Sequence, residues 1–173
     1  MVILRGVQVP GHVVHSDGFR ATTGDLITVA LGFACLRREA AAADEPSRVT
    51  SEEGRDCELV GVSQSYATTI FADGWLVEAA GILLYAQDLG PAADLPPPGT
   101  RVRAQGSLAV AEAYESAGFE PAADLLARAE QQWLVQRIVR RSGPARRVVE
   151  AIDSFRTGSD DYLLDLAGSG HAR

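Results

Sequence analysis

The stretch Gly99-Thr-Arg-Val-Arg-Ala-Gln-Gly-Ser-Leu-Ala-Val110 decides the fold class of this chain of 173 residues. Small or apolar residues alternate with mostly polar ones, which is the period of a β-strand with one buried and one exposed face. Gly106 predicts a bulge or a bend that helps a barrel to close. The expected inward residues are Val102, Ala104, Gly106, Leu108 and Val110, and the expected outward residues are Arg101, Arg103, Gln105 and Ser107.

The segment before this strand predicts a β-hairpin. Leu59–Phe71 and Trp75–Ala86 are β-type runs, and between them stands the dipeptide Asp73-Gly74, which is favoured in two-residue type I′ turns. Such a turn would place Ile70 opposite Val77. We therefore expect two long paired strands in this part of the chain.

The N-terminal third predicts further strands and one loop. Val2–Val9 is a β-type run, and His12–His15 and Phe19–Thr22 are expected to pair around a Ser-Asp-Gly turn. Asp25–Leu36 alternates like a strand with one buried face. Residues 40–56 are rich in alanine and acidic residues and contain little that could build a core. Their length predicts a mobile insertion or a lid.

The C-terminal third predicts one helix followed by strands. Pro121–Gln132 carries an apolar stripe at helical spacing, and its proline suits a first helical turn. Trp133–Arg141, Arg146–Phe155 and Tyr162–Leu166 are β-type runs. Residues 168–173 are expected to form a disordered tail. The remaining residues, 1–167, are expected to form a single domain.

Several strands, one helix and further strands resemble the order of an OB-fold barrel, which has three strands, a helix and two strands. The resemblance covers Asp25 to Phe155, and the stretch Gly99–Val110 is similar to a barrel strand of such domains. It implies a mainly β fold: a small antiparallel, OB-like barrel with one helix, to which this chain adds terminal strands. A fold of this kind does not by itself define a function.

Composition excludes several classes of enzyme. All 16 basic residues are arginine, and lysine and asparagine are absent. Schiff-base chemistry, pyridoxal-phosphate anchoring and the lysine of nucleotide-binding loops are therefore impossible. The bias toward alanine, valine, glycine and arginine is typical of a very GC-rich genome, such as that of an actinobacterium. A net charge of −7 argues against uniform binding to nucleic acids or anionic membranes.

Cysteine usage and hydropathy predict a cytoplasmic protein. Cys35 and Cys57 are too few for a disulfide framework, and no further ligands at zinc-site spacing accompany them. The first residues lack a charged region followed by a long apolar core, so we expect no signal peptide. The longest strongly apolar run, Leu26–Leu36, is far shorter than a membrane span.

Charge is distributed unevenly along the chain. Residues 39–58 contain seven acids and two arginines, whereas residues 128–147 contain six arginines and one acid. The arginine segment could hold single-stranded nucleic acid through phosphate pairing, with an aromatic side chain for base stacking. It could equally bind the acidic segment, either within one chain or in a second copy. The candidate nucleic-acid residues are Arg137, Arg140, Arg141, Arg146, Arg147, Trp133, Arg101 and Arg103.

The candidates for catalysis are poorly supported. His12 and His15 would have to curl toward each other to bind one metal ion, because residues three apart on a strand face opposite ways. Ser63 and Ser65 lie outside any Gly-x-Ser-x-Gly elbow, and Cys35 lies in an apolar run that does not favour a thiolate. The many carboxylates are expected to be solvated surface groups. We therefore predict no catalytic residues, no metal site and no cofactor.

These observations favour a non-enzymatic binding or interaction module whose partner the sequence leaves open, with a protein partner or a second copy of the chain as plausible ligands and no membrane as partner. One alternative is an OB-like binder of single-stranded nucleic acid, which requires Trp133 to be exposed beside the arginine cluster. Another is a small-molecule binder or an enzyme whose barrel mouth is covered by residues 40–56. That alternative requires a deep pocket with converging polar groups.

Overall fold

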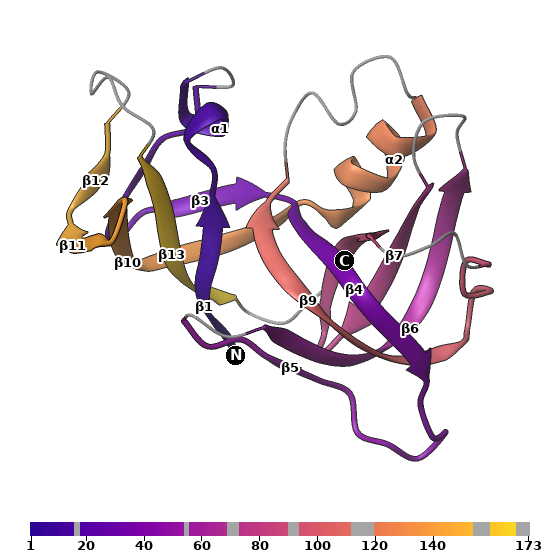
Figure 1. Ribbon diagram of the computed structural model, residues 1–173. Helices are drawn as coiled ribbons and strands as arrows, with labels where there is room; N and C mark the ends of the chain where they lie inside the picture. Colours follow the sequence, from indigo (N-terminus) through magenta and orange to yellow (C-terminus); the bar gives the residue numbers. More distant parts are fainter. Residues whose placement is uncertain are drawn as a thin grey trace.

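The computed structural model describes residues 1–15, 18–53, 56–68, 73–89, 94–111, 120–153 and 160–168. They form a mainly β structure with two helices (Figure 1). The first elements are β1 (Val2–Val9), α1 (Gly11–His15), β2 (Ala21–Thr22), β3 (Leu26–Val29), β4 (Leu31–Ala40), β5 (Arg48–Thr50), β6 (Cys57–Thr68) and β7 (Asp73–Ala79). They are followed by β8 (Ile82–Asp88), β9 (Arg101–Val110), α2 (Glu120–Ala129), β10 (Gln131–Ser142), β11 (Ala145–Val149), β12 (Ala151–Ile152) and β13 (Asp161–Gly168). Neither helix of the described residues is long and apolar enough to cross a membrane.

Five strands close into a barrel, as the sequence predicts. Their order around the barrel is β9-β4-β8-β7-β6, and β6 pairs again with β9. Four of the pairings are antiparallel and one, β4 with β8, is parallel. The expected small, mainly antiparallel barrel is therefore present, and its one parallel pair arises because β4 meets a strand that follows it only after a crossover through β6 and β7. The barrel interior is filled by large buried side chains such as Phe33, Trp75 and Leu84.

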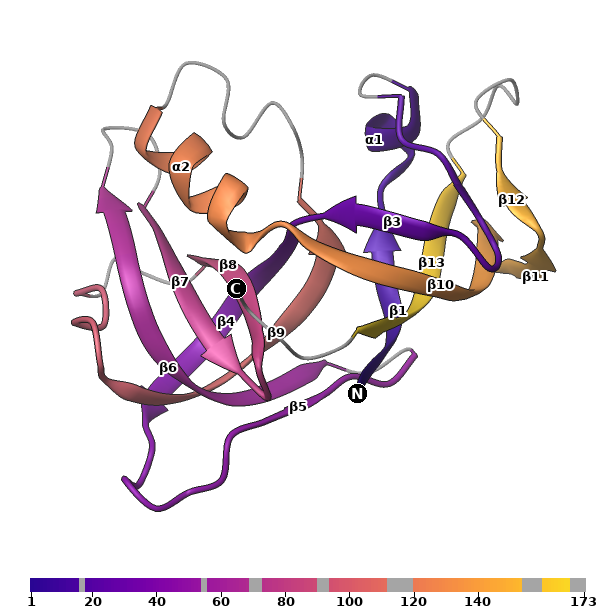
Figure 2. The ribbon, with the colours of Figure 1, turned by 180° about the vertical axis from the view of Figure 1, so that it is seen from behind.

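A second sheet region continues from the barrel wall. β1 has a short parallel pairing with β9 and pairs along its length with β13, which is followed in the sheet by β10 and β11. β3 pairs with the start of β10, and β2 pairs with β12 as a separate ribbon. Figure 2 shows this region beside the barrel. Its buried residues Leu4, Trp133 and Leu164 belong to the same apolar cluster as Phe33 and Trp75, so the two regions share one core.

The alternation of β9 is confirmed, and Gly106 occupies a crowded position. A Cβ atom there would collide with the carbonyl oxygen of Ala34 on β4. The register between β4 and β9 shifts between Cys35 and Arg37, so the bulge predicted near Gly106 lies on β4, at Leu36. Because a bulge adds one residue to a strand, it turns the following side chains to the opposite face.

The predicted helix is present, but its place in the chain order differs from the expectation. α2 follows all five barrel strands, whereas the OB-type order placed a helix between the third and the fourth. Its apolar stripe, Leu125, Leu126 and Ala129, packs on Leu76 and Tyr85 at the outer face of β7 and β8. Trp133 lies beyond the helix, on β10.

The predicted hairpin is present as the antiparallel pair β6–β7, but Asp73-Gly74 is not its turn. Gly74 pairs with Ala67 inside the β6–β7 ladder, and residues 69–72 lie outside the described residues. A second hairpin, β7–β8, has a tight turn at Ala80-Gly81, where both residues have positive φ, 52° and 77°. That is the backbone of a type I′ turn. The run Trp75–Ala86 is therefore split between two strands, and the expected pairing of Val77 is wrong, since Val77 pairs with Ser63.

Two further expectations are corrected. The expected strand His12–His15 belongs to the short helix α1. The expected mobile loop 40–56 contains β5, which pairs with β6, and it makes specific contacts with the rest of the chain. For example, the Ser51 hydroxyl donates a hydrogen bond to the carbonyl oxygen of Arg5 at 2.6 Å. Of the expected tail, Gly168 ends β13, and 169–173 lie outside the described residues.

Candidate functional site

Trp133 is not available as a stacking surface. Its side chain is fully buried in the shared core, and its Nε1 has no hydrogen-bond partner. The reason is the register of β10. Trp133 faces inward and pairs with Gly168, and its ring occupies the position that a side chain on residue 168 would take. The condition that the sequence set for a nucleic-acid surface, an exposed Trp133, is therefore not met.

Two of the candidate arginines bind the acidic segment of the same chain. Arg137 Nη1 lies 3.1 Å from Glu53 Oε2 and 3.4 Å from Asp165 Oδ2, and Arg146 Nη1 lies 2.9 Å from Glu53 Oε1. Asp165 also accepts a hydrogen bond from the backbone N–H of Gly6 at 3.0 Å. The intrachain pairing that the charge asymmetry left open is thus present, and it ties residues 51–53 to the second sheet region.

Of the other arginines on β10 and β11, Arg140 and Arg141 are paired with carboxylates and, among the described residues, Arg147 is not. Arg140 Nε donates to Asp160 Oδ2 at 2.6 Å, and Arg141 Nη2 lies 3.3 Å from Asp161 Oδ2. Asp160 is buried, so this pair is partly shielded from water. Arg147 is exposed and has no hydrogen-bond or ion-pair partner among the described residues. Most of the positive charge of this segment is therefore already neutralised.

Arg101 and Arg103 lie on the barrel wall, and β1 and β13 separate their strand from β10. Arg101 Nη1 donates to the carbonyl oxygen of Glu45 at 2.6 Å, and Arg103 binds Glu45 Oε2 at 2.7 Å and Glu39 Oε1 at 2.8 Å. Hydrogen bonds from Arg103, and then from Arg48, lower the pKa of Glu45. These two arginines thus do not extend the cluster on β10 and β11.

The two thiols are poor nucleophiles and poor metal ligands. Cys35 and Cys57 both pair with Gly106, one from each side, and both are buried. Burial raises the pKa of each thiol to about 12, and the nearby carboxylate of Asp88 adds to the effect at Cys35. Both are therefore protonated at neutral pH.

Ser63 has a structural contact set rather than a catalytic one. Its hydroxyl donates to the carbonyl oxygens of Pro97 and Thr100, the latter at 3.2 Å, and accepts from the Thr100 N–H at 3.1 Å. These bonds fix the turn before β9. Within the described part of the chain, no three His, Cys, Asp or Glu side chains are grouped to hold a metal ion. The side chain of His12 is outside that part.

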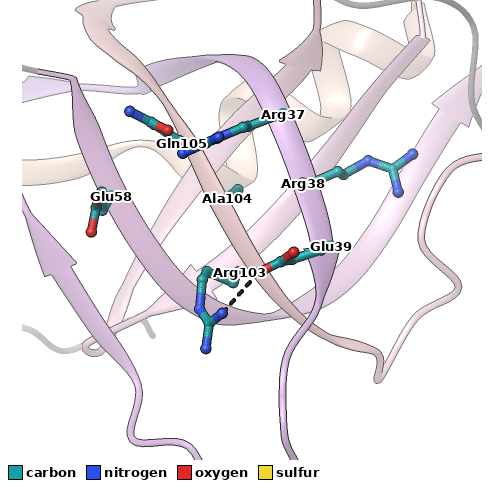
Figure 3. Close-up of a pocket in the computed structure, with 7 residues that line it drawn as sticks. All are labelled: Arg37, Arg38, Glu39, Glu58, Arg103, Ala104 and Gln105. Atoms are coloured by element: carbon teal, nitrogen blue, oxygen red, sulfur yellow. Dashed lines mark hydrogen bonds and ion pairs between the residues drawn. The ribbon is translucent and has the colours of Figure 1, made fainter.

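A groove on the outer wall of the barrel is the site that sequence reasoning missed. It encloses about 220 Å³ and lies across three adjacent strands, β4, β9 and β6 (Figure 3). Its lining is mostly charged or polar, with more arginine than glutamate. The lining residues are Arg37, Arg38, Glu39, Glu58, Arg103, Ala104 and Gln105.

Several of the lining side chains are held by partners. Arg38 Nε donates to Asp88 Oδ2 at 2.9 Å, and its guanidinium lies 5.8 Å from the ring centroid of Trp75. Gln105 Nε2 donates to Asp56 Oδ2 at 2.9 Å. The pairings of Arg103 and Gln105 therefore preorganise the wall of the groove, whereas the Arg38 side chain points away from Gln105 and Glu58, to the other side of β4 (Figure 3).

Arg37 and Glu58 are the exception. Both are exposed, and neither has a hydrogen-bond or ion-pair partner in the described structure. Both are paired in register with Gln105, Arg37 from β4 and Glu58 from β6. Figure 3 shows Arg37 reaching over β9 toward Gln105, with Glu58 on the other side. The groove thus presents one free positive and one free negative charge on opposite walls.

The bulge at Leu36 is the reason that Arg37 reaches this groove. Phe33 and Cys35 face the barrel interior, and continued alternation would turn Arg37 inward as well. Burial of an unpaired guanidinium is costly. An arginine at a position that strict alternation would turn inward therefore indicates a bulge before it. The sequence carried no comparable signal for Glu58, because its position depends on pairing with a strand more than 40 residues later.

Comparison with models of known protein families gives no match. Comparison with curated proteins and with solved structures gives no match either. Evidence on function therefore comes from the residues and geometry described above.

Proposed function

We propose that this chain is a non-enzymatic binding module and that the groove across β4, β9 and β6 is its ligand-binding surface. One observation carries the proposal: among the described residues Arg37 and Glu58 have no partners, although the neighbouring Arg103 and Gln105 are both engaged. Charged side chains that line a hollow and lack intramolecular partners are available to bind a ligand. The non-enzymatic part of the proposal follows from the contacts of the thiols and of Ser63, which leave no activated nucleophile among them.

The test is a map of ligand contacts on the folded protein. The ¹⁵N-labelled chain is titrated with a panel of small charged compounds, namely amino acids, short peptides, nucleotides and sugar phosphates. We expect at least one class to shift backbone amides of Arg37, Glu58 and Gln105 while the second sheet region stays unchanged. Binding that shifts only amides of other surfaces, or no binding by any class, would contradict the proposal.

We further propose that the barrel is of OB type with a permuted chain order. In an OB barrel, the first strand pairs with the second and the fourth strands. The third strand lies between the second and the fifth, and its pairing with the fifth is parallel. Numbering this barrel from β6 through β9 and ending with β4 reproduces each of these neighbours and the single parallel pair. This correspondence supports an OB-like fold for the barrel independently of the position of α2.

A second candidate function, binding of single-stranded nucleic acid, is favoured by that connectivity alone. OB barrels use the face of their second and third strands for oligonucleotides, which here are β7 and β8. In this chain α2 packs on that face through Leu125 and Leu126, and most of the candidate arginines are paired with carboxylates. We therefore place this function behind a binding module that uses the groove.

Fluorescence anisotropy separates the two candidates. Labelled single-stranded DNA and RNA are titrated with the protein at low and at physiological salt. The groove proposal predicts no binding that depends steeply on salt. Micromolar binding at low salt that weakens steeply with salt, and that Arg147→Gln reduces, would instead favour the nucleic-acid function.

The remaining alternative, a small-molecule site in a barrel mouth under a lid, has less support. The interior is filled by Phe33 and Trp75, and the proposed lid is tied down through Glu45 and Glu53. A cytoplasmic location and the choice between a protein partner and a second copy stay predictions from the sequence.

A further inference from the structure

We propose that the groove recognises a small dipolar ligand, an amino acid or a short peptide with a free ammonium and a free carboxylate group. This inference rests on the proposed function, because it assigns a ligand class to the same groove. It starts from the two charges that have no partner, Arg37 and Glu58, which have opposite signs and stand on opposite walls.

The register of the strands sets the distance that such a ligand has to span. Arg37 and Glu58 both lie beside Gln105, and adjacent strands are about 4.8 Å apart, so their backbones are separated by roughly 10 Å. The Arg37 side chain leans across β9 and shortens the gap (Figure 3). A ligand that contacts both charges must therefore carry two opposite charges within roughly 10 Å of each other, as one small molecule can.

The chemistry of the two walls assigns an orientation. A guanidinium offers a planar fork of donors that matches a carboxylate with two parallel hydrogen bonds. The Glu58 carboxylate accepts only, and an ammonium group is the matching donor. Gln105 uses its Nε2 for Asp56, so its Oε1 is left to accept from an N–H at the middle of the ligand.

The size of the groove limits the ligand. About 220 Å³ is below the roughly 300–1,000 Å³ of sites for drug-sized molecules. A single amino acid or a dipeptide therefore fits better than a nucleotide or a folded partner. The flanking charges also disfavour a simple anion, because Glu39 and Glu58 stand in the same lining as the arginines.

The experiment uses three probes that differ only in their charges. L-alanyl-L-alanine carries both end charges, its N-acetyl derivative lacks the ammonium group, and its C-terminal amide lacks the carboxylate. Each is titrated into the ¹⁵N-labelled full chain, and the shifts of the groove amides give the affinity. We expect the uncapped dipeptide to bind, and each capped form to bind at least tenfold more weakly.

Variants of the two walls complete the test. Arg37→Gln and Glu58→Gln are expected to weaken the uncapped dipeptide at least tenfold, whereas the exposed controls Arg147→Gln and Glu130→Gln leave it unchanged. In the Glu58→Gln variant, the N-acetyl and the uncapped dipeptide should bind with equal affinity, because the ammonium group no longer has a carboxylate partner. The amide spectra without ligand show that each variant is folded.

Each other outcome is decisive. Equal groove binding by capped and uncapped dipeptides, or wild-type affinity in both wall variants, would overturn the dipolar ligand and keep the groove as a binding site. Groove shifts caused only by another compound class would have the same meaning. If no compound of either panel shifts the groove amides, both this inference and the proposed function are wrong.

Discussion

The second sheet region and the barrel groove use arginine in opposite ways. On β10 and β11, Arg137 and Arg146 share Glu53, and Arg140 is bound to the buried Asp160. In the groove, Arg37 is exposed and unpaired in the described structure. The difference shows that a high density of arginine in the sequence does not locate a binding surface. The arginines of β10 and β11 that stabilise the fold are mostly paired with carboxylates, whereas the arginine that is available to a ligand, Arg37, lies in the groove.

The largest expected effect comes from an ion pair whose carboxylate is buried. Arg140→Gln removes a charged partner of Asp160, which stays in a largely buried place. Loss of one partner of a buried pair is strongly destabilising, and partial exposure of Arg140 reduces the loss here to about 2–3 kcal/mol. Urea denaturation monitored by circular dichroism measures it. A loss below about 0.5 kcal/mol would show that this pair does not hold the fold.

A smaller effect is expected at the link between the acidic segment and the second sheet region. Glu53→Gln weakens the contacts with both Arg137 and Arg146, whose side chains are 42% and 53% exposed. Exposed pairs contribute about 0.2–1 kcal/mol each, so the free energy of unfolding should fall by about 1 kcal/mol. Salt screens such pairs, and the difference from wild type should shrink in urea titrations at high salt. A loss that is independent of salt would point to packing instead.

The smallest expected effect is a change in the dependence of stability on pH. The pKa of Glu45 is lower in the folded chain than in the unfolded chain, because of Arg103 and Arg48. Its contribution is therefore fully present above its unfolded pKa of about 4.3 and is lost as the pH falls through the folded value. Stability curves from pH 6 to pH 3 should fall less steeply for Glu45→Gln than for wild type. Parallel curves would show that Glu45 does not contribute through its charge.

Local sequence patterns predicted single strands better than their connections. The alternation of β9 is present with the expected inward residues, and Val2–Val9 forms β1 with the expected bounds. The dipeptide Asp73-Gly74 is favoured in turns locally, but strand pairing places both residues inside the β6–β7 ladder, and the second hairpin, β7–β8, turns at Ala80-Gly81. Register depends on contacts between distant segments, which a local dipeptide preference does not include.

The candidate site could be predicted only in part for the same reason. The pairing of the acidic and the arginine segments was one of the possibilities that charge asymmetry suggested, and Glu53 realises it. The groove needed more: two strand registers that place Arg37 and Glu58 beside Gln105, and a bulge that turns Arg37 outward. Neither register follows from residue types at fixed spacing along the chain.

A paired measurement on two arginine variants tests the central claim most directly. Arg37→Gln and Arg140→Gln are each examined for the free energy of unfolding and, under folding conditions, for binding of L-alanyl-L-alanine. We predict that Arg37→Gln changes stability by less than about 0.5 kcal/mol but loses binding, and that Arg140→Gln loses stability but binds like wild type. If Arg37→Gln proves destabilising and binds normally, or if Arg140→Gln abolishes binding while it remains folded, the division between fold-holding and ligand-binding arginines is contradicted.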